Sequence, residues 1–250
     1  MTPTFEILYE DNHMISVIKP SGILSQGDGS GAPDMLSLIA SYIKERDHKP
    51  GNVFVGLVHR LDRNVGGTMV FAKTSKGASR ISESMRKGAF FKGYFVLTQK
   101  KLPCDEGFLV NHLWKDDKIN RVFERADGKC SRLYYQFVGA ENGHNLYFAI
   151  PITGRTHQIR AQFSFAGAPL VGDQKYGVCK RPGFQIGLWS GVVGVPHPVR
   201  RNEMILCTSV PKGEVWNSFK KVDVYVEAFL TKLDIKHYTS LCGKEESNDV

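Results

Sequence analysis

The stretch Val53-Phe54-Val55-Gly56-Leu57-Val58-His59-Arg60-Leu61-Asp62-Arg63 joins an apolar run to a cluster of three basic side chains around one carboxylate. Residues 53–58 have the composition of a buried strand, and residues 59–63 follow them directly. An aspartate at the end of such a strand, close to cations, can remain ionised while it faces an anionic substrate. Two interpretations are open from these residues alone: a carboxylate that acts on nucleic acid, or a surface ion pair between arginine and aspartate.

Strands and helices are interspersed on both sides of this stretch. Apolar patterning and turn residues predict strands at residues 5–9, 14–18, 53–58, 68–72, 90–97, 107–114, 131–138 and 146–150. Helical periodicity and capping residues predict helices at residues 34–46, 75–87 and 156–165. Because strands and helices do not alternate regularly, we expect an α+β fold, with a mixed, largely antiparallel central sheet and flanking helices.

The composition is that of an ordinary globular protein with a basic balance. The chain has 250 residues, with 33 Lys and Arg against 25 Asp and Glu, and a formal net charge of +8. The sequence pI is about 9.2. This balance favours a nucleic-acid partner, although membranes and acidic proteins also attract basic chains.

Several classes of protein are disfavoured. The five cysteines are unclustered, which indicates reduced thiols and argues against structural zinc. No run of residues has the length and apolarity of a membrane span, and no signal segment is evident, so we expect a cytoplasmic protein with no membrane partner. The glycine run at residues 27–31 is separated from the following helix by Pro33, which favours a flexible surface loop over a phosphate-binding loop.

Three stretches carry groups suited to catalysis. They are His59-Arg60-Leu61-Asp62-Arg63-Asn64-Val65-Gly66-Gly67, Lys92-Gly93-Tyr94 and Thr153-Gly154-Arg155-Thr156-His157-Gln158-Ile159-Arg160. Taken singly, Tyr94 is typical of a packed strand aromatic, His157 of a hydrogen-bonded framework histidine, and Arg160 of a surface cation. Their occurrence together and in this order points instead to one shared site.

In these stretches the chain resembles the RluA-type RNA pseudouridine synthases, whose usual signature is HRLDRxTSG followed later by GRxHQ[IL]R. The resemblance runs over residues 5–211 and includes Lys19-Pro20-Ser21-Gly22 and Gly172-Asp173-Gln174-Lys175-Tyr176-Gly177. It implies the pseudouridine synthase fold and the isomerisation of specific uridines in structured RNA, either ribosomal or transfer RNA. Substrate and product contain the same atoms, so the resemblance implies no cofactor and no metal.

The resemblance also assigns roles to single residues. Asp62 matches the nucleophile, Arg160 the arginine that pairs with it, and Tyr94 the tyrosine placed against the uracil. Arg60 matches the residue that fills the space left by the flipped base. The expected RNA-binding residues are Arg60, Arg63, Lys92, Arg155, His157 and Lys175. Further candidates for phosphate contacts are Arg86, Lys87, Lys180 and Arg181.

We expect one catalytic domain over residues 1–235, a flexible polar tail over residues 236–250, no separate N-terminal RNA-binding domain, and a monomer. The chain departs from the family pattern at Val65-Gly66, where the signature has Thr-Ser, and at Leu188-Trp189-Ser190, where Leu-His-Ala is common. The lost hydroxyls leave open an alternative, a catalytically weakened RNA-binding or chaperone protein that retains the fold. A nucleoside glycosidase is disfavoured, because no second carboxylate stands in a matching motif.

Overall fold

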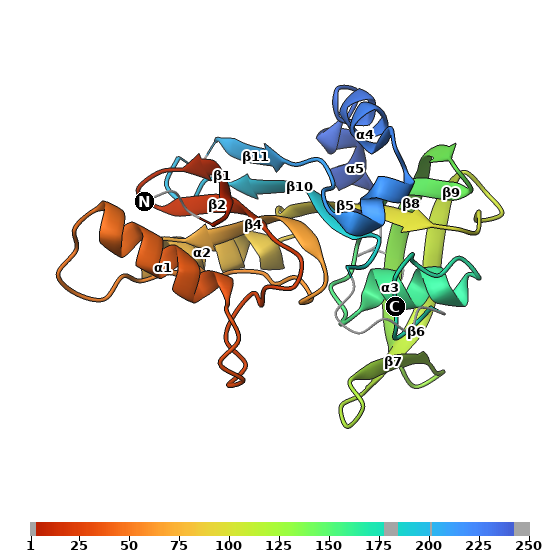
Figure 1. Cartoon of the computed structure of the whole chain (residues 1–250), viewed down its shortest axis with the longest axis horizontal. Coiled ribbons are helices and arrows are strands. Elements are labelled where there is room, and N and C mark those ends of the chain that lie inside the picture. The colour runs from red at the N-terminus through yellow and green to blue at the C-terminus, as the bar shows by residue number, and fades with distance from the viewer. Residues whose placement is uncertain (1–3, 178–184, 201, 243–250) are drawn as a thin grey trace. The chain divides into compact units, whose positions relative to one another are not determined.

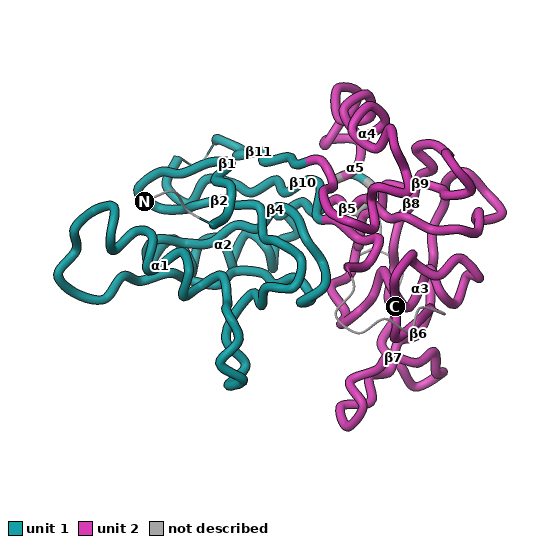
Figure 2. The backbone as a smooth tube through the Cα atoms, viewed as in Figure 1, with its two compact units in different colours: residues 1–92, 190–209, 239–250 teal, residues 93–189, 210–238 magenta. Residues whose placement is uncertain are grey.

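The computed structural model describes residues 4–177, 185–200 and 202–242. It divides the chain into two compact units, which Figure 2 shows in different colours. Unit 1 comprises residues 1–92, 190–209 and 239–250, and unit 2 comprises residues 93–189 and 210–238. Each unit is built on its own run of paired strands.

The sheet of unit 1 has the strand order β1-β2-β4-β10, with β11 paired to β10 (Figure 1). Strand β3 pairs with β4. The bounds of these strands are β1 Glu6–Glu10, β2 Met14–Lys19, β3 Gly56–Leu57, β4 Gly66–Ala72, β10 Leu188–Pro196 and β11 Met204–Thr208. All residues of β2 and β4 are buried, and the two strands pair antiparallel, with Ile15 opposite Phe71. Strands buried on both faces explain the nearly continuous apolar runs in this part of the sequence.

Two helices of unit 1 begin at side-chain caps. Asp34 caps α1 (Met35–Arg46) by accepting a hydrogen bond from the backbone N of Ser37 at 3.1 Å. Thr74 caps α2 (Ser75–Arg86) by accepting from the backbone N of Gly77 at 3.0 Å. Such caps satisfy amides that the first turn leaves unpaired, typically contributing about 1 kcal/mol each.

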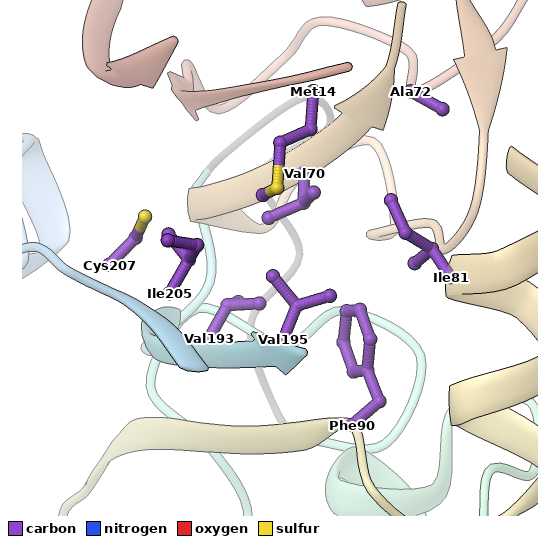
Figure 3. Packing of buried hydrophobic residues seen from close by; sticks show 9 residues of the cluster. All are labelled: Met14, Val70, Ala72, Ile81, Phe90, Val193, Val195, Ile205 and Cys207. Carbon is purple, nitrogen blue, oxygen red and sulfur yellow. The ribbon is translucent and has the colours of Figure 1, made fainter. Parts of the chain in front are cut away.

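The core of unit 1 is formed where α2 meets the sheet. Figure 3 shows Ile81 of α2 together with residues of β2, β4, β10 and β11 and with Phe90. Met14, Val70, Val193 and Val195 are all 0% exposed. Burying each apolar side chain of this size contributes about 1.5–3 kcal/mol, so this cluster is a main source of stability for the unit.

The strands of unit 2 are ordered β5-β9-β8-β6-β7, and the neighbouring pairs β5–β9, β9–β8, β8–β6 and β6–β7 are antiparallel. Their bounds are β5 Phe91–Thr98, β6 Glu106–Asp116, β7 Arg121–Glu124, β8 Lys129–Glu141 and β9 His144–Pro151. Helix α3 (Gln158–Phe165) is tied to this sheet by Gln162, whose Nε2 donates to the carbonyls of Leu109 and Ser131. The 3-10 helix η1 (Glu214–Ser218), α4 (Val222–Leu230) and α5 (Ile235–Cys242) follow in the chain.

The α+β class and the largely antiparallel sheet predicted from the sequence are confirmed. The strand expected at residues 53–58 is reduced to Gly56–Leu57, and the helix expected from residue 156 begins at Gln158. Residues 236–242, assigned from the sequence to a tail, lie in α5. The expected phosphate contacts Lys180 and Arg181 fall outside the described residues, as do residues 243–250.

Within the described residues, none of the helices is long and apolar enough to cross a membrane.

Candidate active site

Residues 58–65 connect β3 to β4 in unit 1, and their side chains alternate between buried and accessible positions. His59 and Leu61 are 8% and 7% exposed. Arg60 is exposed and Asp62 is half-buried. Two buried anchors therefore fix the segment, while the carboxylate of Asp62 keeps access to the surface.

Residues 19–25 hold this segment from one side. The backbone N of Leu61 donates to Ser25 Oγ at 3.0 Å, and the same hydroxyl donates to the carbonyl of Leu61 at 2.8 Å. The backbone N of Gly22 donates to the carbonyl of Arg63 at 2.8 Å. The backbone on both sides of Asp62 is thus fixed by hydrogen bonds.

Lys19 is a buried cation beneath this turn. Its side chain is 0% exposed, and its Nζ donates to the carbonyls of Pro20 at 2.9 Å, Ile23 at 2.6 Å and Arg63 at 3.1 Å. Burial lowers the pKa of Lys19 to about 7, and the negative charge of Asp62 opposes this shift. Lys19 therefore ties the turn together and places a titratable positive charge within electrostatic range of Asp62.

His59 is a framework group of the same turn. Its Nε2 accepts a hydrogen bond from the backbone N of Val70 at 2.9 Å, and its ring lies against Phe90 with centroids 5.3 Å apart. Burial, reinforced by the positive charge of Lys92, lowers the pKa of His59 to about 3. The imidazole is therefore neutral near pH 7 and anchors the segment to β4 rather than serving as a proton carrier.

The departure Val65-Gly66 falls where the turn enters β4. Val65 is 2% exposed and belongs to the packed interior. Gly67, which keeps the last position of the signature, has φ +119°, and a Cβ there would come within 2.4 Å of the Ser190 carbonyl oxygen. Close packing against Ser190 explains the glycine at 67, whereas the described contacts give no reason for Gly66.

In unit 2, Tyr94 lies on β5, is 8% exposed and is paired in register with Ala149 of β9. Gly93 precedes it, and a Cβ at this position would lie 2.2 Å from Cζ of Phe148. The phenyl ring of Phe148 therefore occupies the space beside Gly93. This contact accounts for the glycine in Lys92-Gly93-Tyr94 and fixes the strand that carries Tyr94.

The turn before α3 is shaped by the side-chain amide of Gln158. Its Oε1 accepts from the backbone N of Arg155 and from Thr153 Oγ1, both at 2.9 Å, and its Nε2 donates to the carbonyl of Arg132 at 2.9 Å. His157 adopts a left-handed backbone with φ +51°. The amide replaces hydrogen bonds that an earlier helical turn would have made, which explains why α3 begins at Gln158.

His157 and Lys175 are both engaged by neighbours in unit 2. Nδ1 of His157 lies 2.9 Å from the hydroxyl of Tyr176, which also accepts from the backbone N of Val122 at 2.8 Å. Nζ of Lys175 donates to the carbonyl of Asn120 at 2.5 Å. His157 therefore ties the turn at residues 154–157 to the turn at residues 173–176. Lys175 and Tyr176 tie the second turn to the β6–β7 hairpin.

Arg160 is oriented by Asp173. Its Nε and Nη2 donate to the two carboxylate oxygens of Asp173 at 2.7 and 3.0 Å, and its guanidinium lies 5.3 Å from the centre of the Tyr176 ring. Asp173 is 0% exposed and also accepts from the backbone N of Lys175 and Tyr176. Burial raises the pKa of Asp173, but the hydrogen bonds and charge of Arg160, together with the hydrogen bonds from the backbone N of Tyr176 and Lys175, outweigh burial and leave this pKa below its usual value.

The residues predicted from the sequence are divided between the units. Unit 1 contains Arg60, Asp62, Arg63 and Lys92. Unit 2 contains Tyr94, Arg155, His157, Arg160 and Lys175. Within unit 1, Asp62 shares one turn with Arg60 and Arg63; within unit 2, Arg155, His157 and Arg160 share the start of α3. The pairing of Asp62 with Arg160 stays a prediction.

Sequence reasoning did not identify Lys19, Gln158 or Asp173 as parts of the site. All three lie in stretches that the resemblance already included, and that was the only signal available. Their importance follows from burial combined with polar partners, which a single sequence does not reveal.

In the described part of the chain, no group of three or more His, Cys, Asp or Glu is arranged to hold a metal ion.

Comparison with known proteins gives one consistent result. A model of the family described as RNA pseudouridylate synthase matches residues 13–165. Ribosomal large subunit pseudouridine synthase C of Buchnera aphidicola (subspecies Acyrthosiphon pisum) is 36% identical over 174 residues, covering 68% of this chain and 54% of that protein. The Haemophilus influenzae protein of the same name is 34% identical over 177 residues, covering 69% and 52%. The chain thus spans about half the length of these relatives.

Solved structures agree on the fold. Human RNA Pseudouridylate Synthase Domain Containing 4 superposes with a TM-score of 0.71 at 19% identity, covering 87% of this chain and 93% of that one. Human RNA Pseudouridylate Synthase Domain Containing 1 gives a TM-score of 0.65 at 18% identity, with 86% of each chain covered.

Proposed function

The chain belongs to the RNA pseudouridylate synthase family, and from this premise we propose that it isomerises uridine in RNA to pseudouridine with Asp62 as nucleophile. The observation that carries the proposal is the family match over residues 13–165, which contains Asp62, Tyr94 and Arg160. The geometry of each unit supports it: a half-buried carboxylate sits on a rigid turn in unit 1, and Arg160 is fixed by a buried carboxylate in unit 2.

The proposed reaction balances without any added reagent. Asp62 attacks the uracil ring or the anomeric carbon of the ribose, and the bond from that carbon to N1 of uracil breaks. The base turns, a bond forms from the anomeric carbon to C5, and the bond to Asp62 breaks. The proton on C5 leaves, and N1 of uracil takes up a proton. Tyr94 stacks against the uracil and assists removal of the C5 proton. No atoms or electrons are gained or lost overall.

An ionised nucleophile needs positive charge nearby if substrate covers it. A cation within about 4–6 Å lowers a carboxyl pKa by roughly 1–3 units, which offsets much of the cost of burial. We propose that Arg160 supplies this charge. Its bidentate pair with Asp173 supports the role, because a guanidinium held in one orientation loses little entropy when it engages a second acceptor. Below about pH 7, protonated Lys19 adds a second positive charge from beneath the turn.

We propose ribosomal RNA of the large subunit as the substrate class, with transfer RNA as the other possibility. The names of the relatives support the first choice. The net charge of +8 suits a polyanionic partner. Extruding a uridine from a stem costs a few kcal/mol, and stacking the base on one aromatic side chain contributes on the order of 1–3 kcal/mol. Phosphate contacts must therefore supply much of the net affinity.

The remaining expectations about the whole protein stay predictions. They are a single catalytic domain over residues 1–235, a monomeric state, a cytoplasmic location and the assigned RNA contacts of Arg60, Arg63, Lys92, Arg155, His157 and Lys175. Arg60 and Arg63 are exposed, which supports a role in contacting RNA.

A tritium-release assay tests the proposal. RNA labelled at C5 of uridine, prepared as separate ribosomal and transfer RNA pools, is incubated with the wild-type protein or Asp62→Asn. Isomerisation releases tritium to solvent, so the wild type should release label and Asp62→Asn should release none. Wild-type protein that binds RNA but releases no label from either pool would refute the enzymatic proposal and favour the RNA-binding alternative raised by Val65-Gly66. Free uracil would indicate glycosidic cleavage instead.

A further inference from the structure

A cavity of about 460 Å³ opens in unit 2 beside the turn that precedes α3. Its lining includes Leu113 and Lys115 of β6, Val122 of β7, Lys129 at the start of β8, and Arg155 and Thr156 of the turn. Its volume lies within the range of about 300–1,000 Å³ that is usual for small-molecule and cofactor pockets. None of the residues expected from the sequence to act in catalysis lines this cavity.

Strand register explains why the lining gathers on one face of the sheet. Leu113 is paired with Lys129, and Lys115 is paired with Val122. Directly opposed residues of antiparallel strands point to the same face, and alternate residues of one strand do so too. Lys115, Lys129, Leu113 and Val122 therefore lie on a common face, and α3 packs on that face through Ala161, which joins Leu113 and Val122 in one cluster.

The floor of the cavity is apolar, whereas its rim is basic. Leu113 is 5% exposed and Val122 is 2% exposed. Lys115, Lys129 and Arg155 are exposed at the rim. An apolar floor suits the face of a base or a ribose, and rim cations suit phosphate oxygens.

The charge balance at the rim is positive. The carboxylate of Asp127 also lines the cavity, but both of its oxygens accept hydrogen bonds from Arg125 at 2.9 and 2.8 Å. Lys115 forms an exposed pair with Asp117 at 2.6 Å. Within the described parts of the chain, neither Lys129 nor Arg155 has a carboxylate in ion-pair distance. Two positive charges therefore remain available to an anionic ligand.

Backbone hydrogen bonds hold the turn between β7 and β8, which forms one wall of the cavity. The backbone N of Gly128 donates to the carbonyl of Arg125 at 2.9 Å, and the backbone N of Arg125 donates to the carbonyl of His112 at 3.0 Å. A Cβ at Gly128 would lie 2.7 Å from the carbonyl carbon of His112. On the opposite side, the amide of Gln158 holds the backbone of Arg155. The cavity is thus shaped before any ligand arrives, which reduces the entropy lost on binding.

We propose that this cavity binds a nucleotide of the substrate RNA other than the uridine that is isomerised, with Lys129 and Arg155 on its phosphate. This inference rests on the proposed function and deepens it, since a second nucleotide site would help to select the target. Its position supports an RNA ligand over a separate small molecule, because Arg155 and Thr156 lead directly into His157 and Arg160. Lys129 then joins Arg155 as an RNA contact.

The salt dependence of RNA binding tests the proposal. The variants are Lys129→Gln and Lys129→Gln combined with Arg155→Gln; the control is Lys100→Gln, an exposed lysine of unit 2 outside the cavity. Affinity for a fluorescein-labelled single-stranded 12-nucleotide RNA containing uridine is measured by anisotropy from 50 to 200 mM salt. Each lost phosphate contact lowers the slope of log affinity against log salt by about 0.7. Over this fourfold range, the decline in affinity should be about 2.6-fold smaller for the single variant and about 7-fold smaller for the double variant.

Turnover gives an independent readout on the C5-labelled RNA. The Lys129→Gln variant should raise KM for tritium release and leave kcat at the wild-type value, because the cavity contacts substrate away from the reacting base. Lys100→Gln should match the wild type in both assays. Wild-type slope and KM in the double variant, in a protein that still releases tritium, would overturn the nucleotide site and leave the enzymatic function intact. Altered slopes in a protein that releases no tritium would refute the function and leave the cavity as an RNA contact without a reacting uridine.

Discussion

Breaking the buried ion pair between Arg160 and Asp173 should strongly destabilise unit 2. Asp173 is 0% exposed and accepts two hydrogen bonds from Arg160 and two from backbone amides. Asp173→Asn keeps the size of the side chain but removes its charge and turns one acceptor into a donor facing Arg160. Removing one partner of a buried pair costs about 3–5 kcal/mol. We therefore expect the free energy of unfolding to fall by about 3 kcal/mol, which corresponds to a fall in Tm of about 6–12 °C.

Tryptophan fluorescence can follow this loss in the relevant unit. All three tryptophans of the chain, Trp114, Trp189 and Trp216, lie in unit 2, and the last two are 2% and 1% exposed. For Asp173→Asn, the midpoint of urea unfolding at pH 7 should move to a much lower urea concentration than in the wild type. Asp127→Asn is the matched control, because Asp127 forms a similar two-point pair with Arg125 that is largely exposed. Exposed pairs contribute about 0–1 kcal/mol, so this control should unfold nearly as the wild type does.

The pH dependence of this difference follows from the direction of the pKa shift. The pKa of Asp173 is lower in the folded protein than its usual value. Stability from this group is therefore complete above the unfolded pKa and is lost as pH falls through the folded pKa. The gap between wild type and Asp173→Asn should shrink as the solution is acidified below the ordinary carboxyl range. Equal stabilities for Asp173→Asn and Asp127→Asn at pH 7 would refute the importance of the buried pair.

Two further substitutions test the supports of the site. Lys19→Met should remove a pH dependence from the free energy of unfolding measured by calorimetry. Between about pH 7 and 10.5 the unfolded lysine holds a proton that the folded lysine does not, so wild-type stability should rise relative to the variant by on the order of 4 kcal/mol. A constant difference between the two proteins over this pH range would contradict the lowered pKa of Lys19. Gly93→Ala should destabilise unit 2 by about 1–3 kcal/mol in urea, because its Cβ meets Phe148 at 2.2 Å, whereas Gly154→Ala, with nothing within 4 Å, should not; equal effects would refute the packing argument.

Most of the fold could be predicted where local signals agreed with the tertiary environment. The caps at Asp34 and Thr74 set the starts of α1 and α2 to within one residue of the prediction. The run at residues 53–58 failed as a full strand, since only Gly56 and Leu57 pair with β4 and Phe54 is 49% exposed. An apolar run shows that a segment can be buried, but pairing depends on a partner elsewhere in the chain.

Elements after residue 185 were not predicted, and their composition explains why. Strand β10 contains two glycines, which weaken the strand pattern, and α4 has the sequence VDVYVEAFL, in which valines favour strands. Packing against the rest of the chain overrides these local preferences; α4, for example, contacts β8. A Cβ at Gly139 of β8 would meet the ring of Tyr225 at 2.3 Å, so close contact with α4 determines this glycine.

The sequence predicted the proposed catalytic residues of the site better than the buried residues that hold them in place. Asp62, Tyr94 and Arg160 stand in stretches with a specific spacing, and the resemblance assigned them roles. Lys19 and Asp173 owe their properties to burial beside partners: Lys19 bonds to the carbonyl of Arg63, and Asp173 binds Arg160 across a turn. A single sequence gives the charge of such residues but not their burial, and so it could not show which of them hold the site in place.

The nucleoside content of RNA after reaction tests most directly whether the protein isomerises uridine with Asp62 as nucleophile. RNA transcribed in vitro from large-subunit ribosomal genes contains no pseudouridine, so any that forms must come from the added protein. After incubation with wild type or Asp62→Asn and complete digestion, chromatography with mass detection measures uridine and pseudouridine. Pseudouridine should form with the wild type and not with Asp62→Asn, which should still bind the RNA. Pseudouridine formed equally by both proteins would contradict the role of Asp62 as nucleophile.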